Sequence, residues 1–497
     1  MINFHVRLKN FLHNQKSVQR LLLYFLIVLI FFGAFSKPDF ATDTYAYALG
    51  DFSEITNNFL RCGRIFTAGI YTILRLLSIN ISLINFACFI VAAISLIFAL
   101  YFLEKLLRKN FISNQLWSFL LPIILLINPF IIEYFLFIEK GIMCFCILLC
   151  VLSAQCYANY LDHRKRTDLF KVLLLNVFAT FWYQGVIGLF IVLATMLTVT
   201  KAKQWLLFLK DTVISIGLYI IGPLINVIMI KLFFADGRTS GGLNVIEAAK
   251  MVAGSLDRMF SIFGIIPPII FWGYFVIIVI TWLIYLFRHH EFHILPCVQV
   301  FYLAFVVFLA AVVPQLVLDP DSVWIAPRAV YPFATIIGVS IVLIFHASPK
   351  FPSTNPSKSF LLFTTCCFVS IQFVGFNNII LDHYSLAELD RLRAGQIGNL
   401  ISAYEAASGI EVKYITPSSD QNKTYTYNGI KSVADSNISA FSTYWSDVTS
   451  LNFWNKRSFV RKDPDPKWQA YCSSHDWDTF DTTQLSFVGD TLQICWP

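Results

Sequence analysis

The segment from Ser36 to Arg64 holds the residues of this chain that are best suited to chemistry. It follows the first apolar run, is rich in carboxylates and ends on two arginines, its charged side chains including Asp39, Asp43, Asp51, Glu54, Arg61 and Arg64. A carboxylate can act as a general base, and the planar guanidinium of arginine suits phosphate. Charged groups are costly beside a bilayer, so the polarity of this segment indicates that it has a function at the membrane surface.

The segments around this loop have the composition of membrane spans. Of the 497 residues, 57% are hydrophobic, 16% aromatic and 13% charged, and the mean hydropathy is +0.66. Average soluble proteins carry about 25% charged residues. Repeated apolar runs of roughly 20 residues therefore predict an all-α polytopic membrane protein. We expect about nine transmembrane helices plus a re-entrant segment at 171–201, or eleven helices if that segment is two spans.

The net charge of +7 is divided between two regions of opposite sign. From Asp382 to Cys495 there are ten Lys/Arg and fourteen Asp/Glu, a balance of −4, and the rest of the chain carries +11, mostly in short loops. This is the distribution of the positive-inside rule and not that of a nucleic-acid-binding face. With an odd number of spans, it predicts a cytoplasmic N-terminus and a C-terminus on the opposite face.

The distribution of polar residues predicts two domains. Residues 1–380 form the transmembrane domain, with the loop at 36–64, and residues 381–497 form a polar C-terminal domain with helix-like and then strand-like patterns, hence α+β. Cys472 and Cys495 are the only cysteines of this tail. If the tail faces an oxidising compartment, we expect a disulfide between them. No Cys or His set has metal-ligand spacing, so we expect neither a metal ion nor another cofactor.

The segment at 64–78 is amphipathic rather than uniformly apolar. Its polar residues recur at helical spacing and are Arg64, Thr67, Tyr71, Arg75 and Ser78. This pattern predicts a helix that lies along the membrane interface with its arginines toward the lipid headgroups. A short tilted span is the alternative.

These residues suit sugar transfer from a lipid-phosphate carrier. An acceptor hydroxyl that attacks a sugar bearing a phosphate leaving group needs one general base, and the departing oxygens need positive charge. Asp43 and Asp39 are the candidates for the base. The candidates for phosphate binding are Arg61, Arg64, Arg75 and Arg328.

The motifs in this region resemble those of a known family. Asp43 soon after the first span, Gly50-Asp51 and Gly63-Arg64 are similar to the pattern of bacteriophage-type serotype-converting O-antigen glucosyltransferases, polytopic GT-C-like enzymes that use polyprenyl-phosphate sugars. The chain departs from that pattern because Thr44, not a second acid, follows Asp43. The choice between Asp39 and Asp43 therefore stays open.

The resemblance implies a specific reaction. A glucosyl residue would pass from undecaprenyl-phosphate glucose to a sugar of lipid-linked O-antigen, on the periplasmic face of the bacterial inner membrane. A small flippase and a glucosyltransferase that makes the donor would be the functional partners.

Two alternatives stand beside this reading. An O-antigen polymerase, or another polyprenyl-linked sugar transferase, would use similar substrates. A transporter or flippase for lipid-linked sugars would carry buried charges or broken helices in matching halves of the chain.

Overall fold

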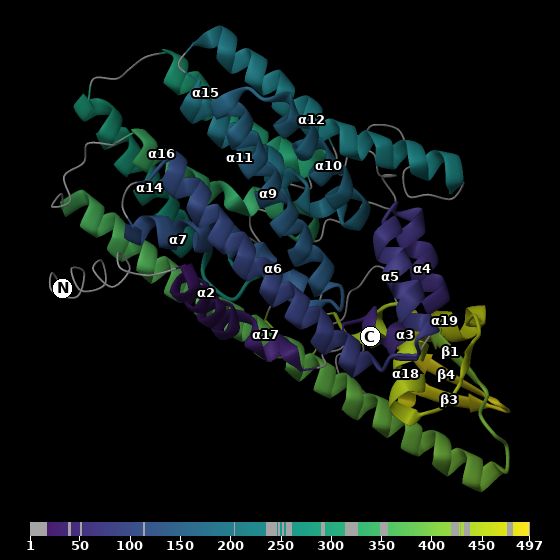
Figure 1. Cartoon of the computed structure of the whole chain (residues 1–497). Helices are drawn as coiled ribbons and strands as arrows, with labels where there is room; N and C mark the ends of the chain where they lie inside the picture. Colours follow the sequence, from purple (N-terminus) through teal and green to yellow (C-terminus); the bar gives the residue numbers. More distant parts are fainter. Residues whose placement is uncertain are drawn as a thin grey trace.

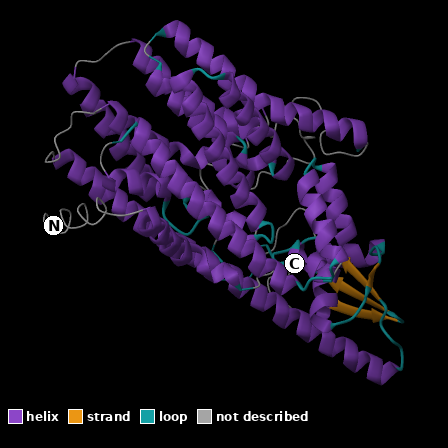
Figure 2. Ribbon diagram, in the orientation of Figure 1, coloured by secondary structure: helices purple, strands orange, loops and turns teal. Residues whose placement is uncertain are grey.

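The computed structural model describes residues 17–37, 41–49, 52–112, 115–202, 204–234, 246, 249–250, 253–254, 261–289, 294–313, 327–347, 356–418, 427, 429–431, 438–474 and 481–496. It is mostly helical, with one small sheet beside the helical bundle (Figures 1 and 2). Within the described ranges, six helices are long and apolar enough to cross a membrane, or seven if one bent pair is a single span. The chain is thus a helical protein with several apolar spans, and the expected nine or eleven stays a prediction.

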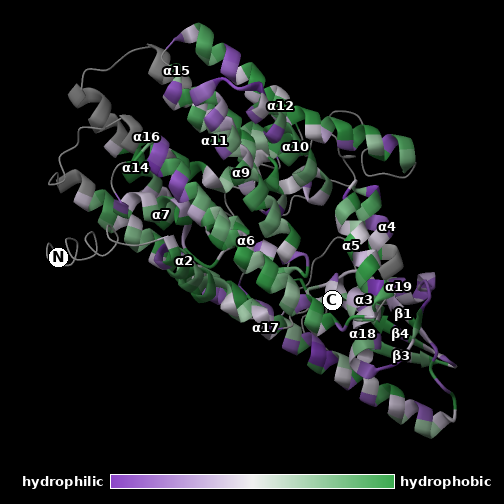
Figure 3. Ribbon diagram, viewed as in Figure 1, coloured by the Kyte–Doolittle hydropathy of each residue, from purple (hydrophilic) through white to green (hydrophobic). Residues whose placement is uncertain are grey.

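Six helices contribute these spans, and several of them have exposed apolar side chains. They are α2 (Ser17–Phe32), α6 (Ile81–Asn110), α9 (Lys140–His163), α11 (Gly188–Lys201), α12 (Trp205–Phe233) and α17 (Pro356–Ser408). On α12, for example, Leu206, Val213 and Leu232 are more than two-thirds exposed. Figure 3 shows hydrophobic residues over most of the bundle. Such a surface is unfavourable in water and suits contact with lipid chains.

Helix α9 lies at the centre of the bundle and is largely buried. It lies against α6, α11 and α10 (Arg166–Trp182). Gly141 permits the close approach to α6, because a Cβ there would lie 2.9 Å from the carbonyl oxygen of Cys88. Small residues at helix contacts let two backbones approach in a membrane. Cys144 and Cys146 are buried in α9 as free thiols.

The segment at 171–201 is a pair of helices, α10 and α11, that meet at a break around Tyr183. A short 3-10 turn, η3 (Gln184–Val186), links them. Lys201, the last residue of α11, bonds to Asp162, a few residues before α10 begins. Both outer ends of the pair therefore lie at the same end of the bundle, and the break lies at the other.

A second break divides the apolar run at Leu116–Ile132, at Asn128-Pro129. Helix α7 (Gln115–Leu126) is followed by η2 (Pro129–Ile131) and α8 (Ile132–Leu136), bent by 51° from α7. Pro129 lacks the N–H that would continue α7, and Asn128 caps the new turn by accepting from the Phe130 N–H at 3.0 Å. Because a broken helix leaves backbone groups without partners, other side chains supply them, as Gln372 does for the carbonyl of Ile127.

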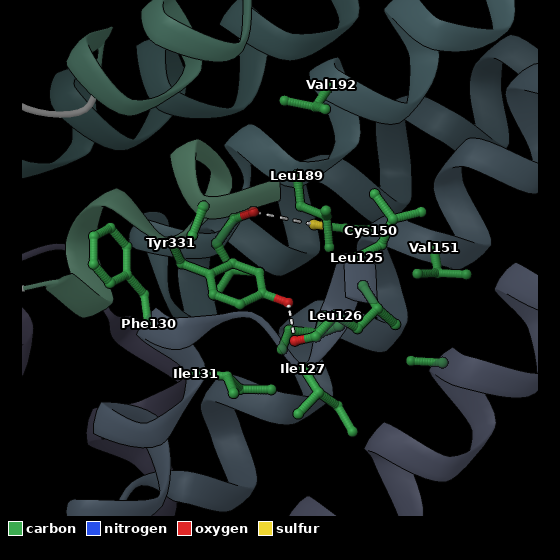
Figure 4. Packing of buried hydrophobic residues seen from close by; sticks show 14 of the residues in the cluster. Leu125, Leu126, Ile127, Phe130, Ile131, Cys150, Val151, Leu189, Val192 and Tyr331 are labelled. Carbon is green, nitrogen blue, oxygen red and sulfur yellow. Dashed lines mark hydrogen bonds between the residues drawn. The ribbon is translucent and has the colours of Figure 1, made fainter. Parts of the chain in front are cut away.

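The bent segment is buried on all sides. Figure 4 shows its residues Leu126 and Phe130 packed among side chains of α9, α11 and η6 (Pro327–Thr335). The Tyr331 hydroxyl of η6 donates to the Leu126 carbonyl at 2.8 Å. The remaining described helices of this region are α14 (Pro268–His289), α15 (Ile294–Val312) and α16 (Ile336–Ala347).

The expected boundary at 380/381 falls inside a continuous helix. Helix α17 has 53 residues and, at 1.5 Å per residue, is about 80 Å long. Since a hydrocarbon core is about 30 Å thick, α17 extends well beyond any bilayer that it crosses. Figure 1 shows it running along the bundle and on beneath the sheet. Ala394, Ile397 and Ile401 of its last part belong to a second hydrophobic core.

This second core lies under a four-stranded sheet of order β2-β1-β4-β3. The strands and adjacent helices are β1 (Tyr414–Ser418), α18 (Asp447–Asn455), β2 (Val460–Arg461), α19 (Pro466–Ser473), β3 (Leu485–Val488) and β4 (Thr491–Cys495). Strand β1 is parallel to β2 and β4, with Tyr414 opposite Thr491, whereas β3 and β4 form an antiparallel hairpin. The C-terminal part is therefore a small α+β unit anchored on α17.

A disulfide joins Cys472 of α19 to Cys495 of β4, with a Cα–Cα distance of 5.2 Å. By chain entropy, a loop of 23 residues contributes on the order of 3 kcal/mol. We expect Cys472→Ser to lower the unfolding free energy of the C-terminal unit by about that amount. Thermal unfolding with and without reductant measures the effect, and Cys366→Ser, an exposed free thiol on α17, is the matched control. Alkylation of both tail thiols without reductant would contradict the prediction.

Candidate functional site

Asp43 lies at the start of a short helix, α3 (Thr44–Ala48), that joins the bundle to the C-terminal unit. Its half-buried carboxylate makes no capping hydrogen bond to α3. On one side of α3, Tyr47 donates to Oε1 of Glu139 at 2.8 Å. Elsewhere on the helix, the Tyr45 hydroxyl accepts from the indole N–H of Trp454 in α18 at 3.2 Å. Two buried tyrosines thus hold Asp43 between the two parts of the molecule.

Glu139 is the carboxylate that faces this end of α3 from the bundle. It lies between α8 and α9 and is about nine-tenths buried. Burial raises the pKa of Glu139, and the charge of Asp43 raises it further. Burial, followed by the Glu139 charge, also raises the pKa of Tyr47 well above its ordinary value. The Tyr47 phenol is therefore a neutral hydrogen-bond donor at any physiological pH.

Arg64 lies at the turn between α4 (Phe52–Arg61) and α5 (Ile65–Leu76). Its Nε donates to Oε1 of Gln184 at 3.3 Å, and its guanidinium lies 4.6 Å from the centre of the Tyr183 ring. Gly63 makes this turn possible because its φ is +72° and a Cβ would lie 2.5–2.8 Å from the Asn226 side chain. The Gly63-Arg64 pair is thus explained by a tight turn that aims Arg64 at the α10–α11 break.

Arg328 reaches the same region from η6, which is distant in the sequence. Its backbone N–H donates to Oε2 of Glu133 at 2.9 Å, and its guanidinium lies 3.9 Å from that oxygen. The guanidinium also stacks on Phe137, 4.1 Å from the ring centre. The Tyr134 hydroxyl donates to the Arg328 carbonyl at 3.0 Å, so α8 fixes the position of Arg328.

Both arginines lie close enough to Tyr183 for their charges to act on its phenol. The charges that act on its phenol are those of Arg64, Arg328, Glu133 and Glu139. The α10–α11 break therefore gathers two guanidinium groups and two buried carboxylates at one end of the bundle. A site with a carboxylate and two arginines can combine proton transfer with binding of an anion such as phosphate.

The structure does not bring every expected residue to this cluster. Arg61 is exposed at the end of α4, and Arg75 is exposed in the last turn of α5, about 16 Å along the helix from Arg64. Asp39 and Asp51 lie outside the described residues. The candidates that do converge are Asp43, Arg64 and Arg328.

Part of the polar stripe expected on the interfacial helix packs against the protein, whereas Arg75 is exposed. Helix α5 forms within the expected bounds, but Thr67 and Tyr71 of its polar stripe are buried and Thr67 donates to the Trp182 carbonyl at 2.8 Å. The exposed positions include Ile73 and Leu76. In a membrane the apolar face of a helix can point outward, and the polar face, with Arg64, then packs against the protein.

Sequence reasoning missed three charged residues of this site, Glu133, Glu139 and Lys140. Lys140 is fully buried and donates to Oδ1 of Asn85 at 2.8 Å and to the Phe35 carbonyl at 3.3 Å. The available signal was their position just after the Asn128-Pro129 break, because charges within or beside spans mark functional sites. Among the described residues, no group of three or more His, Cys, Asp and Glu could hold a metal ion.

Comparison of the chain with protein-family models, curated proteins and solved structures finds no match.

Proposed function

We propose that this chain is a membrane glycosyltransferase that moves a glucosyl residue from undecaprenyl-phosphate glucose to a lipid-linked O-antigen. The observation that carries the proposal is that Asp43, near Glu139, lies at the same end of an apolar bundle as Arg64 and Arg328, which are at the α10–α11 break. A lipid phosphate lies at the membrane surface, where a loop carboxylate and arginines can meet it. The assignment of O-antigen as the acceptor and of glucose as the transferred sugar comes from the resemblance of the loop to the glucosyltransferase family.

In this proposal Asp43 takes the proton of the acceptor hydroxyl as that oxygen bonds to the anomeric carbon. The bond between that carbon and the phosphate oxygen breaks, and its electron pair stays on the phosphate. Arg64 and Arg328 then balance the charge that develops on the departing oxygens. The planar guanidinium groups would offer several donors to those oxygens at once.

The opposite end of the bundle has the character of a cytoplasmic face. Lys109 and Lys201 both pair with Asp162, and Arg164 pairs with Asp211. Since basic residues concentrate on the cytoplasmic side, the proposed site belongs on the periplasmic face of the bacterial inner membrane.

This orientation predicts the result of reporter fusions. A reporter that is active only in the periplasm should be active when fused after Ser408, at the end of α17, and inactive when fused at Arg166. Alkaline phosphatase activity in intact cells measures both. The reverse pattern would contradict the proposed sidedness of the site.

The test of the function is a transfer assay with purified protein in liposomes. The donor is polyprenyl-phosphate glucose with a radiolabelled sugar, and the acceptor is lipid-linked O-antigen. We expect the label to move to the acceptor and free polyprenyl phosphate to appear. Failure of transfer to any lipid-linked glycan acceptor would overturn the proposal, and transfer of a different polyprenyl-linked sugar would replace the glucosyl assignment.

Transport of a lipid-linked sugar is the second candidate, because one observation favours it. The α7–α8 break is followed by the buried Glu133 and Lys140, and broken helices with buried charges are typical of transporters. In the same liposomes, a transporter would move the labelled donor between leaflets without breaking its sugar–phosphate bond. Chromatography of the lipid products distinguishes the two activities.

A further inference from the structure

Glu139 has hydrogen-bonding capacity that its neighbours leave unused. Oε1 accepts from Tyr47, but Oε2 is buried and has no hydrogen-bond partner among the described residues. A buried oxygen of a carboxylate without a partner is costly, and a bound proton removes most of that cost. The position of Glu139 therefore suits a carboxyl group that takes up and releases a proton.

The position of Asp43 makes it the natural source of that proton. Asp43 lies at the start of α3, and Tyr47 follows four residues later within the helix. The two side chains therefore lie on the same side of α3. Tyr47 contacts Glu139 directly, and the charge of Asp43 adds to burial in raising the pKa of Glu139. Two carboxylates in such a relation tend to share one proton.

The other titratable or charged groups around Glu139 come from four parts of the chain. Beyond α3, they are Arg64 and Tyr71 at α5, Cys88 on α6, Lys140 on α9, and Tyr183 at the α10–α11 break. Lys140 points to Asn85 and the Phe35 carbonyl, and Arg64 to Gln184 and Tyr183. Among these groups of the described residues, the acidic side chain is that of Asp43.

We propose that Asp43 and Glu139 form one proton-sharing carboxyl pair, in which Glu139 receives the proton that Asp43 takes from the acceptor hydroxyl. The inference rests on the proposed function for the origin of that proton. The proton leaves the hydroxyl, passes through Asp43 to Glu139, and is released to water when the products depart, so Asp43 is ionised again for the next turnover. Glu139 acts through Asp43 and is a positioning residue rather than one that touches the sugar.

The direct test is an infrared titration of the purified protein. The stretching band of the protonated Glu139 carboxyl is identified as the band that Glu139→Gln removes. In Asp43→Asn, its midpoint should move to lower pH by about one unit, because a like charge no longer disfavours ionised Glu139. In Tyr47→Phe it should move to higher pH, because ionised Glu139 loses its hydrogen-bond donor. These opposite shifts require no enzymatic activity.

Glu104→Gln is the matched control for this titration. Glu104 is a buried glutamate in α6 that also accepts from a tyrosine, Tyr24, at 2.9 Å. Its replacement should leave the Glu139 band and midpoint unchanged. If no band depends on Glu139, or if its midpoint is the same in Asp43→Asn as in the wild type, the pair is overturned.

A kinetic measurement supplies the second readout. Glu139→Gln should lower kcat with little change in the KM for the donor, and should move the acid limb of the pH–rate profile to lower pH because Asp43 loses a like-charged neighbour. A structural role alone would leave that limb in place, and this outcome would overturn the pair. A wild-type protein without transferase activity would instead overturn the proposed function, while the infrared coupling would still decide whether the pair exists.

Discussion

Replacing Asp43 with asparagine should lower the rate of sugar transfer by about 10²–10⁴-fold. The substitution keeps the side-chain volume and removes the proton acceptor that the acceptor hydroxyl needs. Stability and membrane insertion should change little, since the carboxylate is half-buried and makes no cap on α3. Initial rates in the liposome assay, at matched protein amounts, measure the effect.

Asp39→Asn is the comparison for this experiment, because both acids belong to the same loop and both are candidates for the base. It should be the milder change. A wild-type rate for Asp43→Asn with an inactive Asp39→Asn would assign the base to Asp39. Full activity of both variants would remove this loop as the catalytic centre and favour the transporter.

Replacing Arg328 with methionine should have the second large effect, on both stability and activity. Glu133 is fully buried, and the guanidinium of Arg328 lies 3.9 Å from its carboxylate. Removal of one partner of a buried ion pair typically costs 3–5 kcal/mol, and we expect about 3 kcal/mol because the backbone N–H of residue 328 still donates to Glu133. Thermal unfolding in detergent measures the loss of stability, and the liposome assay measures the loss of transfer.

A double variant separates the two roles of Arg328. In Glu133→Gln combined with Arg328→Met, the buried charge is gone, so stability should return close to that of the wild type. Transfer should stay low, because the cation expected at the lipid phosphate is still missing. Recovery of transfer together with stability would show that Arg328 serves the fold alone.

Several features of this protein follow from local sequence. Apolar runs of about 20 residues identify spans because each residue of a helix advances 1.5 Å and the hydrocarbon core is about 30 Å thick. The helix break at Asn128-Pro129 can be predicted from the sequence because proline has no N–H to donate to the helix. Cys472 and Cys495 could be paired because the polar tail offers no other cysteine, and Asp43 stood out as a carboxylate just beyond a span.

Only tertiary packing decided which charged groups meet. Asp43 and Glu139 are almost a hundred residues apart, and Glu133 and Arg328 almost two hundred, so no local pattern links them. The stripe on α5 illustrates the same limit: its spacing defined a polar face, but whether that face met headgroups or protein depended on Tyr183 and Gln184 from the α10–α11 break. Buried charges are stable only with partners, and packing brings those partners from distant segments.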